Sequence, residues 1–221
     1  GVNLLAGRAV QRALHPFMAA ELGDSFDLDR ALRHGMVPLV WSAVDSEDTL
    51  RSYLSLYIRE EVQQEGLVRD VGGFARFLEA VALTHGAPRN LAAIAAECQV
   101  SRKTVEGHLG ILHDLLLCFS LPVFQRRAQR LLTAHPKLYW FDCGVFAAAR
   151  PRGPLDRPEE LRGAALEGLV AQHLRAWIDY GQRNLQMHFW RTRAGNEVDF
   201  VLYGEDGFHA IEVKAGESVR G

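Results

Sequence analysis

Two charged segments near the end of the sequence carry the residue types of a metal-dependent phosphodiesterase. Residues 197–214 (EVDFVLYGEDGFHAIEVK) alternate apolar and polar side chains on both sides of a Gly-Glu-Asp-Gly turn, which predicts a β-hairpin. Symmetric pairing about the turn places Asp199 opposite Glu212 and Glu197 opposite Lys214. Facing carboxylates repel each other, and a divalent cation beside a lysine is the usual compensation in such enzymes.

A third carboxylate lies in the helix predicted for residues 159–180. Glu167 has the helical spacing of the apolar face that should pack on the sheet. That face also contains Val170, Ala171, Leu174 and Ile178. An acid on a buried face needs a partner, and a cation shared with the hairpin acids would provide one. A helix Glu, a strand Asp and a strand Glu-x-Lys follow the order of a PD-(D/E)xK nuclease core.

The chemistry expected of this set is hydrolysis of a phosphodiester. Glu167, Asp199 and Glu212 would hold one Mg²⁺ or Mn²⁺, which would polarise the phosphate and lower the pKa of a bound water. Asp199, Glu212 and Lys214 would be the catalytic residues, with Lys214 stabilising charge on the phosphate or orienting the water. The alternative is an ordinary charged edge strand, or a degenerate core that binds nucleic acid or a partner without cutting it.

The order of several motifs resembles the C-terminal part of bacterial and archaeal AAA-type ATPases that carry a nuclease-like domain of unknown function. These motifs are LLAGRAVQRALHPFMAAEL, HGMVPLVW, YLSLYIREEV, HPKLYWFDCGV, GAALEGLVAQHL and NEVDFVL…AIEVK. The resemblance implies a P-loop ATPase domain, then a small lid, a winged helix and a PD-(D/E)xK-like domain. The sequence contains no G-x-x-x-x-G-K-S/T phosphate loop, so we expect any ATP to bind an ATPase domain upstream of residue 1, which would be a partner.

The sequence predicts a mixed α/β fold in three parts. Residues 1–66 would form a helical lid or linker, residues 67–137 a winged-helix domain, and residues 138–221 a nuclease-like domain that is incomplete at its C-terminus. In the lid, helices are expected over residues 28–34 and from Glu47 to about Glu65, the second capped by Asp45 or Ser46.

A helix-turn-helix is predicted by the segment LAAIAAECQVSRKTVEGHLGIL. Asn90 would cap its first helix and Ser101 its second, and Gln99 stands where glycine usually supplies a positive φ. The exposed front of the second helix would offer Arg102, Lys103 and His108.

Basic residues gather in the same part of the chain. Residues 101–140 carry 6 Lys and Arg against 2 Asp and Glu, although the whole chain has a net charge of −2. In a DNA-binding protein, these side chains would contact phosphates and a groove. The predicted nucleic-acid contacts are Arg102, Lys103, Arg126, Arg127 and Arg130. Winged helices also serve as protein-docking modules, so DNA and a protein partner both remain open.

Composition sets the outer limits. The chain has 221 residues, of which 48% are hydrophobic and 24% charged, as in ordinary globular proteins. No apolar run approaches the roughly 20 residues that span a bilayer, and the three cysteines form no CxxC pair. We therefore expect a cytoplasmic protein with reduced cysteines and no membrane partner.

Three functions fit these observations. The first is an ATPase fragment whose nuclease-like domain cuts or binds DNA. The second is a non-catalytic module that recognises nucleic acid or a protein partner for the ATPase. The third is a regulator that binds DNA through residues 101–137 and uses the last domain as an effector or oligomerisation unit.

Overall fold

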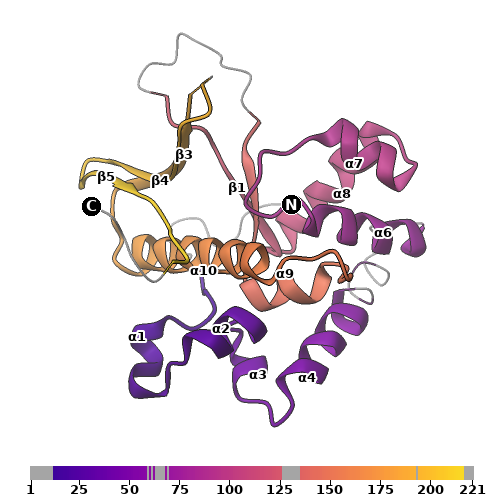
Figure 1. The fold of residues 1–221 in the computed structure, drawn as a ribbon, viewed down its shortest axis with the longest axis horizontal. Helices are drawn as coiled ribbons and strands as arrows, with labels where there is room; N and C mark the ends of the chain where they lie inside the picture. The colour runs from indigo at the N-terminus through magenta and orange to yellow at the C-terminus, as the bar shows by residue number, and fades with distance from the viewer. Residues whose placement is uncertain are drawn as a thin grey trace, which may run out of the picture.

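Two cores separated by a small sheet and one long helix organise the molecule (Figure 1). The computed structural model describes residues 12–58, 60, 62, 68, 70–125, 135–192 and 194–216. In this part of the chain it contains nine α-helices and two small antiparallel sheets, so the predicted mixed α/β class is confirmed. None of the helices in these ranges is long and apolar enough to cross a membrane.

The first core packs the N-terminal helices against α9 (Cys143–Ala149). The N-terminal helices are α1 (Ala19–Leu22), α2 (Leu28–His34), α3 (Pro38–Trp41) and α4 (Ser46–Ser52). A 3-10 turn lies at Gly23–Ser25 and a π-helical stretch at Tyr53–Ile58. The predicted helix over residues 28–34 is confirmed, and Asp45 caps α4 by accepting a hydrogen bond from the Asp48 amide. The last part of the predicted helix to Glu65 lies outside the described residues.

Close backbone contact holds α2 against α9. Gly35 has φ = 76°, and a Cβ there would lie 1.9 Å from Asp142 Oδ1. Asp142 is fully buried and accepts hydrogen bonds from the amides of Met36, Gly144 and Val145, which caps α9 and ties it to the turn after α2. These bonds give Asp142 a structural role.

Three helices follow, and the last two lie where the helix-turn-helix was expected from the sequence. They are α6 (Val71–Ala82), α7 (Leu91–Cys98) and α8 (Arg102–Asp114). Asn90 caps α7 and Ser101 caps α8, each by accepting an amide hydrogen bond. Gln99 adopts the left-handed conformation with φ = 55°, as its place after α7 predicted.

The small sheet separates the two cores. It pairs β1 (Cys118–Leu121) with β2 (Lys137–Trp140), from Cys118 opposite Trp140 to Leu121 opposite Lys137. Because successive side chains point to opposite faces of a strand, Leu138 and Trp140 face the first core while Tyr139 faces the second. The β1–β2 pair therefore joins both sides of the expected domain boundary at residue 137.

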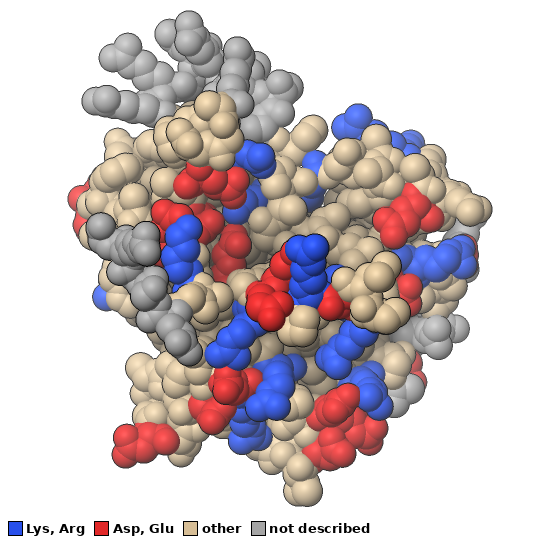
Figure 2. All heavy atoms as spheres, in the orientation of Figure 1, with Lys and Arg blue, Asp and Glu red and all other residues tan. Residues whose placement is uncertain are grey.

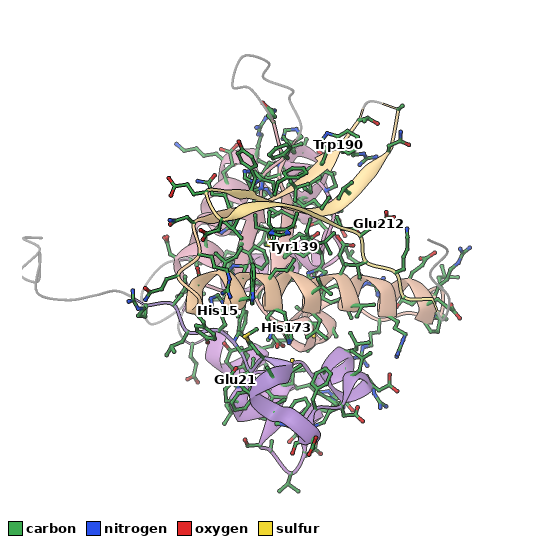
Figure 3. The ribbon with its side chains drawn as sticks, turned by 90° about the vertical axis from the view of Figure 1, so that its left-hand side faces the viewer. His15, Glu21, Tyr139, His173, Trp190 and Glu212 are labelled. Atoms are coloured by element: carbon green, nitrogen blue, oxygen red, sulfur yellow. The ribbon has the colours of Figure 1, made fainter. Side chains whose placement is uncertain are left out.

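The second core lies between α10 (Pro158–Tyr180) and a three-stranded sheet. The strands are β3 (Leu185–Arg191), β4 (Glu197–Gly204) and β5 (Gly207–Ile211), in the order β3-β4-β5. Tyr203 pairs with Phe208, which confirms the symmetric hairpin register. The N-terminal segment runs along α10, where His15 Nε2 lies 2.6 Å from Asp179 Oδ2 and the Ala19 amide donates to His173 (Figure 3).

Candidate functional site

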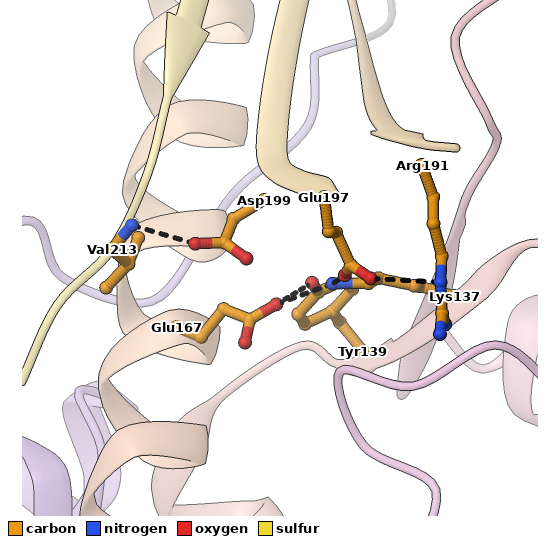
Figure 4. Close-up of polar contacts among 7 residues, drawn as sticks. All are labelled: Lys137, Tyr139, Glu167, Arg191, Glu197, Asp199 and Val213. Atoms are coloured by element: carbon orange, nitrogen blue, oxygen red, sulfur yellow. Dashed lines mark hydrogen bonds and ion pairs between the residues drawn. The ribbon is translucent and has the colours of Figure 1, made fainter. Parts of the chain in front are cut away.

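A lysine that sequence reasoning did not select lies at the centre of the candidate site. Lys137 begins β2 and is 2% exposed. Its Nζ lies 3.1 Å from Glu167 Oε1 on α10 and 2.5 Å from Glu197 Oε1 on β4 (Figure 4). Burial alone would lower the pKa of Lys137, but the two carboxylates together outweigh burial and raise the pKa. The lysine is therefore a charged, fully paired cation.

Glu167 has the partner that its position on the buried face of α10 required. Besides Lys137, it accepts a 2.5 Å hydrogen bond from the Tyr139 hydroxyl at the same oxygen, Oε1. Burial, and then the nearby charge of Glu167, raise the pKa of Tyr139 well above its ordinary value, so the hydroxyl stays protonated and donates. Figure 3 shows Tyr139 in the layer between the sheet and α10.

A glycine lies close to the carboxylate group of Glu167. Gly86 has φ = 70°, and a Cβ at this position would lie 3.6 Å from each Glu167 carboxylate oxygen. The Gly86 amide also donates to the Leu138 carbonyl, which fixes this segment against β2. The backbone thus fixes one wall of the site beside the carboxylate.

The hairpin residues separate into two environments. Asp199 lies beside Glu167 and accepts a 2.8 Å hydrogen bond from the Val213 amide through Oδ2 (Figure 4). The strand pairing ends at Phe200 and Ile211, one residue before the expected pair of Asp199 with Glu212. Glu212 and Lys214 are more than half exposed and form an ion pair with each other.

The expected pairing of Glu197 with Lys214 is wrong. Glu197 contacts Lys137 instead, and its Oε2 lies 3.5 Å from Arg191 Nε. Glu212 as a metal ligand, and Asp199, Glu212 and Lys214 as catalytic residues, stay predictions. The ion pair with Glu212 and, more weakly, the charge of Asp199 raise the pKa of Lys214. Among the described residues, no group of three His, Cys, Asp or Glu side chains is arranged to hold a metal ion.

The comparison with family models divides the chain at this site. Residues 25–156, more than half of the chain, match the model described as domain of unknown function DUF8612. The chain belongs to the DUF8612 family. Residues 162–221 match a second domain of unknown function, DUF4143, which is commonly found C-terminal to AAA ATPase domains. No curated protein and no solved structure matches the chain.

The site lies across both matches. Lys137 and Tyr139 belong to the DUF8612 match, whereas Glu167, Glu197 and Asp199 belong to the DUF4143 match. Neither matched segment alone contains the lysine together with its acids. The ion pairs of Lys137 therefore connect the two segments.

The expected nucleic-acid contacts in the DUF8612 segment have mixed outcomes. Arg102 Nε lies 3.0 Å from Glu106 Oε1 one turn along α8, and Lys103 is exposed without a described ion pair. Arg126, Arg127 and Arg130 lie outside the described residues.

One residue of the expected recognition front is placed wrongly by the sequence prediction. His108 packs inward, with its ring centroid 5.1 Å from that of Phe74 and 5.0 Å from that of Phe77. Burial lowers the pKa of His108, which favours the neutral ring. This histidine is part of the packing between α6 and α8 and is not on the exposed front of α8.

Proposed function

We propose that this chain is a non-catalytic docking module of an AAA-type ATPase, with a winged helix and a nuclease-like core that holds no divalent cation. The common position of DUF4143 after AAA ATPase domains supports the association with an ATPase. The observation that carries the rest is the position of Lys137. Its ammonium group bonds to both Glu167 and Glu197. It thus lies among the acids, where a cation would be expected.

Charge balance explains how an ammonium group can take this place. A cluster of acids around a partly buried pocket is stable only when a cation compensates its charge. Lys137 provides one unit of positive charge, and its burial lets it interact strongly with two carboxylates. A divalent ion would have to displace this lysine or find its ligands elsewhere in the site.

The surface of α8 favours a protein partner over DNA. The glutamate partner of Arg102 offsets its charge, His108 points inward, and Lys103 is the one unpaired cation of α8 in the described part of the chain. Strong phosphate binding normally needs several such cations on one face. Helix-turn-helix packing with a weakly charged front suits docking to a protein surface, such as the ATPase domain.

A metal-dependent phosphodiesterase is the second candidate, and the geometry of Asp199 favours it. The described bonds of Glu167 use Oε1, and that of Asp199 uses Oδ2. Each carboxylate thus retains one oxygen without a described protein partner. If the segment after β5 moved Glu212 toward them, a set of three carboxylates and Lys214 would form.

Calorimetric titration with Mn²⁺ distinguishes the two candidates. We expect no measurable binding to the wild-type chain and gain of binding in Lys137→Met, because Glu167 and Glu197 then lack a cation. The double variant Lys137→Met/Asp199→Asn tests whether Asp199 joins the new site, and Lys214→Met removes an exposed lysine as the matched control. Wild-type binding that disappears in Asp199→Asn would refute the docking proposal and favour the phosphodiesterase.

The folding of Lys137→Met needs its own check. Removing one partner of a buried ion pair costs about 3–5 kcal/mol, whereas loss of an exposed pair costs about 0–1 kcal/mol. Urea unfolding should therefore show a large loss of stability in Lys137→Met and almost none in Lys214→Met. Mn²⁺ should restore part of the loss in Lys137→Met, because a ligand that binds only the folded state stabilises it. If Lys137→Met does not fold, the wild-type and Asp199→Asn titrations still decide.

A further inference from the structure

A cavity away from Lys137 combines an apolar floor with arginines. It has a volume of about 660 Å³ and lies among α2, α4, α9 and the start of α10. Its floor includes the buried side chains of Leu32, Leu50, Phe146 and Ala165. Figure 2 shows Lys and Arg atoms gathered in the lower half of the view, with acidic atoms between them. This volume is within the range of small-molecule sites, about 300–1,000 Å³.

The cavity lining is strongly basic. Five arginines and one histidine line it, and Glu47 is its one acid. The arginines are Arg33, Arg51, Arg150, Arg152 and Arg162. They come from α2, α4, the segment between α9 and α10, and α10 itself. The fold thus brings together arginines from four parts of the chain.

Three of these arginines already have carboxylate partners. Their ion pairs are Arg51 with Glu47 at 2.6 Å, Arg150 with Asp156 at 2.7 Å and Arg162 with Asp29 at 2.6 Å. Two positive charges remain after these three pairs are subtracted from the five arginines. The excess charge belongs to Arg33 and Arg152.

Arg33 and Arg152 are available for a ligand. In the described part of the chain, Arg33 donates through Nε to the Asp29 carbonyl at 3.2 Å, and Arg152 has no hydrogen bond or ion pair. Both are exposed. His34 lies in the same lining, where burial and then the positive charge of Arg33 lower its pKa. The neutral ring can donate or accept a hydrogen bond without adding charge.

We propose that this cavity binds a phosphorylated small molecule of nucleotide size, with its phosphates on Arg33 and Arg152 and its apolar part against the floor. Guanidinium groups bind phosphate oxygens through paired, charge-assisted hydrogen bonds. The floor of Leu32, Leu50 and Phe146 provides an apolar surface that inorganic phosphate does not need. This proposal is independent of the chemistry at Lys137, since none of its residues contacts that site.

Calorimetry with three probes in EDTA tests the assignment. We expect ADP to bind more tightly than pyrophosphate, because ADP also covers the floor, and adenosine to bind more weakly than ADP, because it lacks phosphates. The variant Arg33→Ala/Arg152→Ala should weaken ADP binding by about tenfold or more. It removes no described ion pair, so we expect the chain to remain folded.

The matched control removes two arginines elsewhere. Arg12→Ala/Arg76→Ala has the same change in net charge, and neither residue lines the cavity. ADP affinity in this control should stay within about twofold of the wild-type value, since distant exposed charges are screened. Three results would overturn the proposal: no binding of ADP, equal affinity for pyrophosphate and ADP, or equal losses in both double variants.

Discussion

A buried lysine destabilises the folded state unless acids surround it. Lys137 illustrates how one such residue can organise a site. Its position on β2 removes it from water, while Glu167 and Glu197 approach from two other elements. Tyr139 adds a hydrogen bond to the same oxygen of Glu167, which fixes that carboxylate further. Glu167 Oε1 therefore accepts hydrogen bonds from both Lys137 and Tyr139.

The buried histidine His85 allows a prediction at the scale of a residue. Its ring stacks on Phe146 with centroids 4.1 Å apart, and Nδ1 accepts a hydrogen bond from the Trp140 amide. Burial lowers the pKa of His85 to about 3, from 6.5 in the unfolded chain. Between these pH values the unfolded state binds the proton and the folded state does not. His85 should therefore cost about 1.4 kcal/mol of stability per pH unit as the pH falls below 6.5.

Urea unfolding at several pH values checks this slope. His85→Asn retains an acceptor near the Trp140 amide and cannot titrate, so the stability difference between wild type and variant should shrink or reverse as the pH falls. Asp142→Asn provides a comparison of opposite sign, because burial raises the pKa of Asp142 to about 6. Its carboxylate should lower stability as the pH rises from about 4 to about 6. Equal slopes in wild type and His85→Asn would contradict the assignment.

At the scale of an element, the clearest prediction concerns Gln99 at the end of α7. Gln99 has φ = 55°, and its amide donates to the carbonyls of Ala95 and Ala96. A left-handed conformation costs a non-glycine residue about 1 kcal/mol or more. Gln99→Gly should therefore raise the free energy of unfolding by up to about 1 kcal/mol, whereas Gln99→Val, which is β-branched, should lower it. Urea midpoints of the two variants should move in opposite directions; equal midpoints would show that the strain is absent.

Local signals explain why much of this fold could be predicted from the sequence. Asp45, Asn90 and Ser101 cap their helices through amides three residues ahead, so each cap is encoded within a single turn. The hairpin register follows from the symmetry of its turn and from strand alternation, and the pairing of Tyr203 with Phe208 confirms it. These interactions depend on few residues that are close in sequence.

Contacts between residues far apart in the sequence explain why Lys137 was missed and His108 was placed wrongly. Lys137 lies 30 residues from Glu167, and nothing local shows that β2 crosses α10 at that point. A signal was nevertheless present, because Lys137 is one of only three lysines and begins an otherwise apolar strand, KLYW. Likewise, His108 was assigned to an exposed face because helical spacing alone does not reveal that Phe74 and Phe77 cover it.

At the scale of the whole molecule, the two cores share their supporting elements. Leu138 and Trp140 of β2 pack into the first core while Tyr139 packs into the second. In the same way, Leu169 of α10 packs into the first core and Ala171 into the second. Neither core can lose β2 or α10 without exposing apolar surface in the other, so the boundary between the two family matches is not a flexible linker of the kind that separates independent domains.

This sharing predicts one cooperative unfolding transition for the chain. Phe77→Ala in the first core and Phe200→Ala in the second should each lower stability by about 3–5 kcal/mol, since both side chains are fully buried. If the cores unfold together, each substitution shifts the same urea transition, and tryptophan fluorescence and far-ultraviolet circular dichroism give coincident curves with an unchanged slope. Independent cores would instead give two transitions, of which Phe77→Ala moves only one and Phe200→Ala only the other. Coincident curves would mean that the ion pairs of Lys137 form within a single folding unit, so that loss of those pairs weakens the helical N-terminal core as well as the sheet.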